Sequence, residues 1–106
     1  MFLRQIATQA TFTPDKMAKH SLAGGASLFA GLNAFEPGQE HAPHTHPGQD
    51  KLYLILQGRG IVQVGEASEL LSAGDAAFAA AGVVHAIRNP GPERLIVMAV
   101  LAPPPK

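Results

Sequence analysis

Glycine and proline recur so often along this chain that long helices have little room to form. There are 11 glycines and 9 prolines among its 106 residues. Half of them lie in short turn-like segments, at residues 35–38, 57–60, 64–66, 72–75, 81–82 and 89–92. Proline interrupts a helix and glycine weakens it, whereas both are favoured in turns. The segments in between are short and rich in Leu, Ile and Val, a pattern that predicts an all-β sandwich or barrel.

Four strands are predicted most clearly, at Leu52–Leu56, Ile61–Val64, Val83–Ile87 and Leu95–Leu101. The first and last of these are apolar at every position, which is typical of strands that are covered on both faces. One face would line the barrel, and the other would meet a second sheet or a second subunit. Asp75–Ala81 is rich in alanine, a strong helix former, but Gly82 ends it after barely two turns, so we expect a strand there too.

The length of the chain is enough for one core and too small for two, which predicts a single domain over residues 1–106. We place its barrel at about 26–101, after an N-terminal strand or arm within 1–20. In that region Phe2–Thr8 would form an edge strand or an arm that reaches a neighbour. Residues 102–106 would be a proline-rich extended tail. No apolar run resembles a signal segment or a membrane span, so we expect a soluble, cytoplasmic protein.

Composition excludes several classes of function. Eight basic and eight acidic residues give a net charge of zero and no basic stripe, which argues against nucleic acid as a partner. The absence of cysteine excludes disulfides, thiolate nucleophiles and cysteine-ligated metals. No serine lies in a Gly-x-Ser-x-Gly motif and no glycine-rich phosphate loop is present, so hydrolase and nucleotide-binding functions have no support.

Three of the five histidines have a spacing that suggests a metal site. His44 and His46 are two residues apart, so on an extended backbone their rings project from one face. His85 lies in an otherwise apolar segment, where an inward imidazole needs a partner for its ring nitrogens. Taken alone, a histidine in an apolar strand is more often a hydrogen-bonded core residue, and His-x-His also occurs by chance. A metal shared by His44, His46 and His85 would satisfy all three rings.

The residues that frame these histidines resemble two sequence motifs of the cupin superfamily. Gly38, His44, His46 and Gly58 follow its first motif, Gly-x5-His-x-His-x3–4-Glu-x6-Gly. The segment from Gly74 through Gly82 and His85 to Asn89 is similar to its second, Gly-x5-Pro-x-Gly-x2-His-x3-Asn. The resemblance extends over about residues 26–101.

This resemblance implies a small single-domain cupin, which is an antiparallel jelly-roll β-barrel, also called a double-stranded β-helix. It implies one divalent transition metal per chain near the barrel mouth, bound by His44, His46 and His85. Iron or manganese would be preferred, with nickel, copper or zinc as alternatives. It also implies that the second apolar face of the strands is buried in a homodimer.

The sequence departs from the family pattern at Lys51, which stands where the family has its glutamate ligand. Ala80 also replaces a proline, but that proline only stiffens a turn. A lysine ammonium has no lone pair to offer a metal. Three outcomes follow: a three-histidine site completed by water, a site in which Asp50 or Gln49 swings in from the loop, or a pocket that has lost its metal.

Several neighbouring residues are weaker candidates. Asp50 precedes the inward position by one residue, so a regular strand would point it to the opposite face. His41, three residues before His44, is outside strict alternation and would be a further ligand, a group supporting the ligands, or a solvated loop residue. Tyr53 should share the face of Lys51, so either would contact a bound ligand or simply pack in the core. His20 is predicted at the surface, and four polar residues are predicted in turns: Asn33, Glu36, Asp75 and Asn89.

Three functions fit these residues. The first is a metal-dependent dioxygenase or related oxidoreductase acting on a small organic molecule. A site without a carboxylate is more positive, which favours an anionic substrate, and Lys51 would pair with its charge. The second is a metal-assisted isomerase or epimerase with His41 or Tyr53 as the base. The third is a non-catalytic module that binds or senses a small molecule, in which Lys51 replaces the metal.

Overall fold

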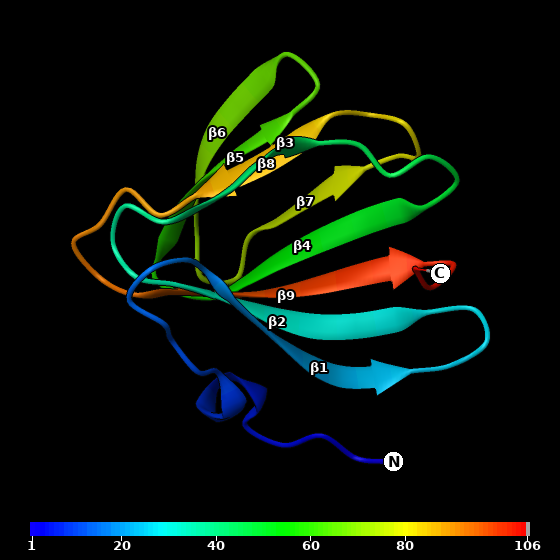
Figure 1. Ribbon diagram of the computed structural model, residues 1–106, viewed down its shortest axis with the longest axis horizontal. Helices are drawn as coiled ribbons and strands as arrows, with labels where there is room; N and C mark the ends of the chain where they lie inside the picture. The colour runs from blue at the N-terminus through cyan, green and yellow to red at the C-terminus, as the bar shows by residue number, and fades with distance from the viewer. Residues whose placement is uncertain (106) are drawn as a thin grey trace.

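The protein consists of two antiparallel β-sheets that face one another (Figure 1). A computed structural model describes residues 1–105. The first sheet has the strand order β1-β2-β9-β4-β7, and the second has the order β3-β8-β5-β6. This confirms the all-β jelly-roll prediction, although the two sheets are not joined into a closed barrel. The elements are η1 (Ile6–Gln9), β1 (Ala18–Gly24), β2 (Phe29–Phe35), β3 (Glu40–His44), β4 (Asp50–Gln57), β5 (Arg59–Val64), β6 (Ala67–Ser72), β7 (Ala76–Ala79), β8 (His85–Arg88) and β9 (Leu95–Ala102).

The main core lies between the two sheets. Along β4 the buried side chains alternate, with Lys51, Tyr53 and Ile55 facing inward and Leu52 facing out. Val62 and Ile87 meet them from the second sheet. Aromatic and β-branched residues fill this space well because they suit a pleated, buried surface. The buried members of this core are Phe35, Tyr53, Ile55, Val62, Ile87, Leu95, Val97 and Ala99.

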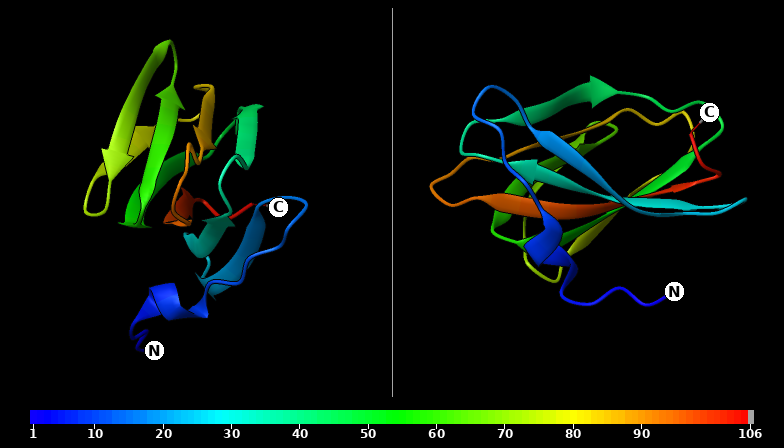
Figure 2. Two further views of the ribbon diagram at one scale, coloured as in Figure 1. Left: turned by 90° about the vertical axis from the view of Figure 1, so that its left-hand side faces the viewer. Right: turned by 60° about the horizontal axis from the view of Figure 1, so that its bottom comes forward.

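A smaller apolar cluster covers part of the outer face of the first sheet. Residues of the N-terminal arm, including Ile6 and Phe12, pack against Leu22, Leu32 and Ile96. In place of the edge strand considered for Phe2–Thr8, the arm makes one 3-10 turn and lies on its own sheet (Figures 1 and 2). Gln5, with its left-handed φ of 46°, interrupts any extended run there.

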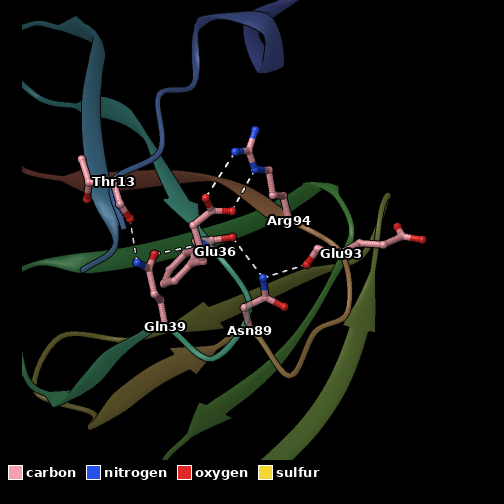
Figure 3. A network of polar contacts seen from close by, with 7 residues as sticks. Thr13, Glu36, Gln39, Asn89, Glu93 and Arg94 are labelled. Atoms are coloured by element: carbon pink, nitrogen blue, oxygen red, sulfur yellow. Dashed lines mark hydrogen bonds and ion pairs between the residues drawn. The ribbon is translucent and has the colours of Figure 1, made fainter. Parts of the chain in front are cut away.

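A polar network closes the end of the molecule formed by the β2–β3 and β8–β9 loops (Figure 3). The buried Asn89 side chain donates from Nδ2 to the carbonyl oxygens of Phe35 (3.0 Å) and Glu93 (2.8 Å). Its Oδ1 accepts a hydrogen bond from the Gly91 backbone (2.8 Å). One amide therefore joins the ends of β2 and β8 to the loop that enters β9.

Two further contacts at this end tie down the chain before β1 and the start of β9. Gln39 Nε2 donates to the Thr13 carbonyl (2.7 Å), while its Oε1 accepts from the Glu36 backbone (2.8 Å). Arg94 Nε forms an ion pair with the Glu36 carboxylate at 2.8 Å. With this end closed, the opposite end is where the three histidines lie.

Most predicted strands are present, with shifted ends. Ala76–Ala79 forms strand β7, as expected. Strand β8 begins only at His85, because Val83 and Val84 form an irregular link after the turn at Ala81 and Gly82. The strands named from the sequence did not include β1, β2 or β6. Of these, β1 pairs with β2 at the sheet edge. Asn33, predicted in a turn, is buried within β2. Among the described residues, no helix is long and apolar enough to cross a membrane.

Candidate metal centre

Three histidines meet at the open end from two strands and one loop. His44 ends β3 and His85 begins β8, and the two are direct partners across the β3–β8 pair. His46 lies in the loop that leads from β3 to β4. Two segments about 40 residues apart in sequence are thus brought together by one strand pairing.

The potential ligand atoms of His44, His46 and His85 all lie within 4.8 Å of one another. The ring centroids of His44 and His85 are 4.2 Å apart, and those of His44 and His46 are 4.8 Å apart. The Nε2 atom of each of the three rings is buried and has no hydrogen-bond partner. Buried polar atoms are rarely left unpaired, so three such atoms together indicate a shared ligand.

Two backbone contacts define which nitrogen each ring offers. His44 Nδ1 lies 2.7 Å from the Ala42 carbonyl, and His85 Nδ1 lies 3.0 Å from the Val83 carbonyl. A carbonyl only accepts hydrogen bonds, so in both rings Nδ1 carries the proton. The lone pair of each ring is therefore on Nε2, directed toward the shared space, as in metal-binding histidines.

The electrostatic environment keeps these rings neutral. Burial is the largest cause in every case, and it lowers the pKa of His44 to about 4. The pKa values of His46 and His85 are lowered as well, by burial and by the positive charge of Lys51. Neutral imidazole is the form that binds metals, so the cluster is ready for a cation at neutral pH.

Lys51 is buried beneath this cluster, with only 3% of its surface exposed. Its Nζ lies 4.8 Å from the centroid of the Tyr53 ring, a cation–π contact. None of the described carboxylates pairs with it. Burial, with a smaller effect of Lys19, lowers the Lys51 pKa to about 8, so the ammonium is still mostly charged at neutral pH.

The loop residues Asp50 and Gln49 are engaged elsewhere. Asp50 is exposed, and its Oδ1 accepts a hydrogen bond from the Ala81 backbone at 2.9 Å. Gln49 Nε2 donates to the Pro103 carbonyl at 3.0 Å. Asp50 does not join the histidine group. The Gln49 side chain also interacts with His46, where its hydrogen bond partly offsets the lowering of the pKa. Asp50 instead ties the start of β4 to the turn that precedes His85.

His41 lies against the cluster but outside the three-ligand group. Its ring stacks on that of His44 at 4.1 Å, and its buried Nδ1 has no partner. A regular strand would point residues 41 and 44 to opposite faces, but the β3–β8 register shifts between them. Pro43 lies within this shift and has no N–H to donate, which accounts for the irregularity. Burial, followed by the neighbouring His44, lowers the His41 pKa to about 3.

Tyr53 lies deeper in the interior. Its ring centroid is 6.0 Å from that of His85, and its buried hydroxyl has no hydrogen-bond partner. Burial raises the pKa of this hydroxyl. Tyr53 is thus a neutral group beneath the histidines and Lys51.

A cavity of about 300 Å³ opens beside the cluster. His41, His46 and Lys51 line it on the histidine side. Lys19 and Asn33, on β1 and β2, line it as well, and sequence reasoning gave neither of them a role. The sequence contains little indication of these positions. Apolar and polar residues do not alternate clearly along β1, so its inward face could not be identified from the sequence.

The donor set fits a divalent transition metal. Three neutral imidazoles suit iron, manganese, nickel, copper or zinc, and they leave coordination positions for water or another ligand. His44, His46 and His85 would hold the metal through Nε2. Carbonyl contacts to the Nδ1 atoms of His44 and His85 would orient those two rings.

Known proteins show the same architecture. The cupin-domain family model matches residues 31–101. An oxalate-binding protein from Thermotoga maritima is 32% identical over 85 residues, which cover 80% of this chain and 69% of that protein. The crystal structure of TT1209 from Thermus thermophilus matches with a TM-score of 0.94 at 38% identity, over 99% of this chain and 100% of the other. A double-stranded β-helix protein from Klebsiella pneumoniae matches with a TM-score of 0.88 at 26% identity, over 95% and 84% of the two chains.

Proposed function

This chain belongs to the cupin family, and from that premise we propose that it binds one divalent transition metal and a small organic anion. His44, His46 and His85 hold the metal, which is iron or manganese by preference and otherwise nickel, copper or zinc. The anion binds in the adjacent cavity, where the protein acts as a metal-dependent dioxygenase or a related oxidoreductase.

The observation that carries this proposal is the set of three buried Nε2 atoms that lack any partner. Leaving one buried acceptor unpaired costs about 1–3 kcal/mol, so three within 4.8 Å are a large cost unless something binds them. A divalent cation satisfies all three at once.

The charge of Lys51 supports an anionic ligand. This buried ammonium faces the cavity without a carboxylate partner, and an anion there offsets its lost hydration. The relative from Thermotoga maritima is named for binding oxalate, a small dianion. That name also points to a carboxylate-containing ligand for this chain.

The protein's own groups would control the reaction in simple ways. When bound, the metal supplies a Lewis acid and, for a redox-active ion, an electron-transfer centre. Lys51 orients the anionic end of the substrate. Apolar residues of the cavity wall, such as Phe29 and Leu101, exclude water from reactive species.

One alternative is a binding or sensing module without catalysis, and Lys51 favours it. In that case the ammonium at the family's glutamate position holds an anion by itself, and no stoichiometric metal is present. A metal-assisted isomerase is the other alternative. Of its two candidate bases, only His41 is unprotonated at neutral pH, because the pKa of the Tyr53 hydroxyl is raised. The His41 pKa of about 3 makes that ring a weak base, so this alternative has less support.

A homodimer is proposed as the assembled form. Leu52 and Phe78 are paired neighbours on the outer face of the first sheet and are 38% and 56% exposed. The N-terminal arm covers only the other part of this face. An exposed apolar strip of this kind is typical of a protein interface.

The test is metal analysis of untagged protein, followed by calorimetric titration of chelator-treated protein with Fe(II), Mn(II) and Zn(II). We expect one ion per chain in the wild type and none in His85→Ala. Oxygen consumption is then measured with the metal-loaded protein and small carboxylates. Absence of binding by all three metals, with the unfolding midpoint of His85→Ala unchanged, would overturn the metal site in favour of the binding module.

A further inference from the structure

The cavity beside the histidines has a floor of small residues. Ser21, Gly31 and Ala99 are paired across β1, β2 and β9 and lie on the cavity side of the first sheet. Larger side chains at these positions would fill the space. At one end of this floor stands Lys51 on β4, and at the other end stands Lys19 on the edge strand β1.

Lys19 and Asn33 form a second polar site at the rim. They are direct partners in the β1–β2 pair, and cross-strand partners have Cβ atoms about 4.5–5.5 Å apart. Asn33 is 5% exposed, and it is among the residues that line the cavity. Its amide is therefore a polar group that a ligand in the cavity can contact, next to the positive charge of Lys19.

All the charge that lines this cavity is positive. It contains two lysines and the weakly basic histidines, and none of its lining residues is acidic. Neither Lys19 nor Lys51 forms an ion pair with a described carboxylate. The acidic residues nearest in sequence to Lys19, His41 and Lys51 are all exposed, and they are Asp15, Glu40 and Asp50. Asp50 also accepts a hydrogen bond from the Ala81 backbone.

The two positive ends are well separated. Strands β4 and β1 are three positions apart in the sheet order β1-β2-β9-β4. At roughly 4.8 Å between neighbouring strands, the floor spans about 14 Å before the lysine side chains reach inward. The two lysines thus approach the cavity from well-separated strands, and a molecule with an acidic group at each end can contact both.

We infer that the ligand of this cavity is a small dicarboxylate longer than oxalate. One carboxylate lies at the histidine cluster above Lys51, and the other lies at the rim between Lys19 and Asn33. A volume of about 300 Å³ is at the lower end of the range for small-molecule sites, which limits the ligand to a short carbon chain.

This inference rests on the proposed function for the first carboxylate and adds the second subsite. The test compares glutarate with valerate, which have the same number of carbons but differ in the second carboxylate. Binding is measured by calorimetry on zinc-loaded protein at constant ionic strength, because zinc has no redox chemistry and allows no turnover by that route. The variants are Lys19→Gln and Asn33→Asp, with the exposed Lys16→Gln as the matched control.

We expect the wild type to prefer glutarate over valerate. Lys19→Gln should lower the glutarate affinity about tenfold, the value of one charge-assisted hydrogen bond, and leave valerate and oxalate within about twofold. Asn33→Asp should weaken glutarate binding further by placing a negative charge at the rim. Lys16→Gln should behave as the wild type.

The outcomes separate this inference from the proposed function. Stoichiometric zinc binding without a Lys19-dependent preference for glutarate would overturn the inference alone. If the wild type does not bind zinc but still prefers glutarate in a way that depends on Lys19, the rim subsite is supported and the metal site is overturned. An equal loss of glutarate affinity in Lys16→Gln and Lys19→Gln would also overturn the inference. Such a result would show that only the net charge of the protein matters.

Discussion

Lys51 decides more of the chemistry than any other single residue. It stands at the position of the family's glutamate ligand, is buried, and remains mostly charged at neutral pH. A positive charge beside three imidazoles opposes the binding of a divalent cation and favours the binding of an anion. We therefore expect weaker metal binding and stronger anion binding here than at a site with a carboxylate in this position.

Replacing Lys51 with glutamate should strengthen metal binding. Lys51→Glu removes the repulsion and adds a carboxylate at the ligand position, so we expect metal affinity to rise about tenfold or more. Calorimetric titration of chelator-treated protein with Mn(II) and Zn(II) measures this. Lys51→Met is the control, because it removes only the charge and should give a smaller rise. If Lys51→Glu binds metal no more tightly than Lys51→Met, glutamate at this position does not reach the metal.

The histidine cluster should make the metal-free protein sensitive to mild acid. The pKa values of His41 and His44 are lowered from 6.5 to about 3 and about 4, mainly by burial. Below pH 6.5 the unfolded chain therefore binds more protons than the folded protein, so stability falls as the pH falls toward 4. The unfolding midpoint of metal-free protein, followed by circular dichroism, should decrease between pH 7 and pH 5.

His41→Gln provides the control for this effect. It removes the ring with the most strongly lowered pKa, so its unfolding midpoint should fall less steeply over the same pH range. A wild-type midpoint that is constant from pH 7 to pH 5 would contradict the lowered pKa values. Carboxylates contribute little in this range because they protonate at lower pH.

At the scale of the strands, one irregularity in β3 shapes the centre. Because the register shifts at Pro43, His41 and His44 turn to the same side and stack. The regular alternation used for the sequence prediction does not allow this arrangement. Pro43 was the available signal, since proline within a strand indicates an edge or a bulge.

Glycine at position 58 is required by close packing between strands. Gly58 has a φ of +81°, and a Cβ there would collide with the backbone carbonyl of Arg94 at the entrance to β9. Gly38 has a similar φ of +87° but open space around it. Gly38→Ala should therefore lower the free energy of unfolding by only about 1–2 kcal/mol, the cost of placing alanine in the left-handed conformation.

Gly58→Ala should cost clearly more, about 3 kcal/mol or above, because backbone must also move. The free energy of unfolding from urea titration measures both variants. If Gly38→Ala and Gly58→Ala lose the same free energy of unfolding, the left-handed conformation alone accounts for the loss, and the contact with Arg94 does not contribute.

At the scale of the whole molecule, we expect the uncovered part of the outer sheet face to form the proposed dimer interface. Phe78 and Leu52 lie opposite one another, and Leu52 is also paired with Val100 of β9. We expect Phe78→Glu to convert a dimer of twice 11.1 kDa into a monomer, as measured by light scattering at micromolar concentration. Leu70→Glu is the control, because Leu70 is 51% exposed on the other sheet. A monomeric wild type would contradict the dimer.

The sequence alone was sufficient for the architecture and for the residues most relevant to a metal. Frequent turns and short apolar segments predicted an all-β fold, because both depend on local backbone preferences. The spacing of His44, His46 and His85 within two glycine-framed motifs predicted a cupin, and the family match confirms that resemblance. Period-two alternation also predicted that Lys51 and Tyr53 share a face, as the structure shows.

Only the tertiary structure decided what surrounds these residues. The three histidine Nε2 atoms come together because β3 pairs with β8. This pairing joins segments that are distant in sequence. Asn33 was predicted in a turn, yet the pairing of β2 with β1 and β9 buries it against the cavity. Lys19 faces the same space from an edge strand whose pattern is weak. Such positions depend on strand order and register, which arise from packing between sheets and not from local sequence preference.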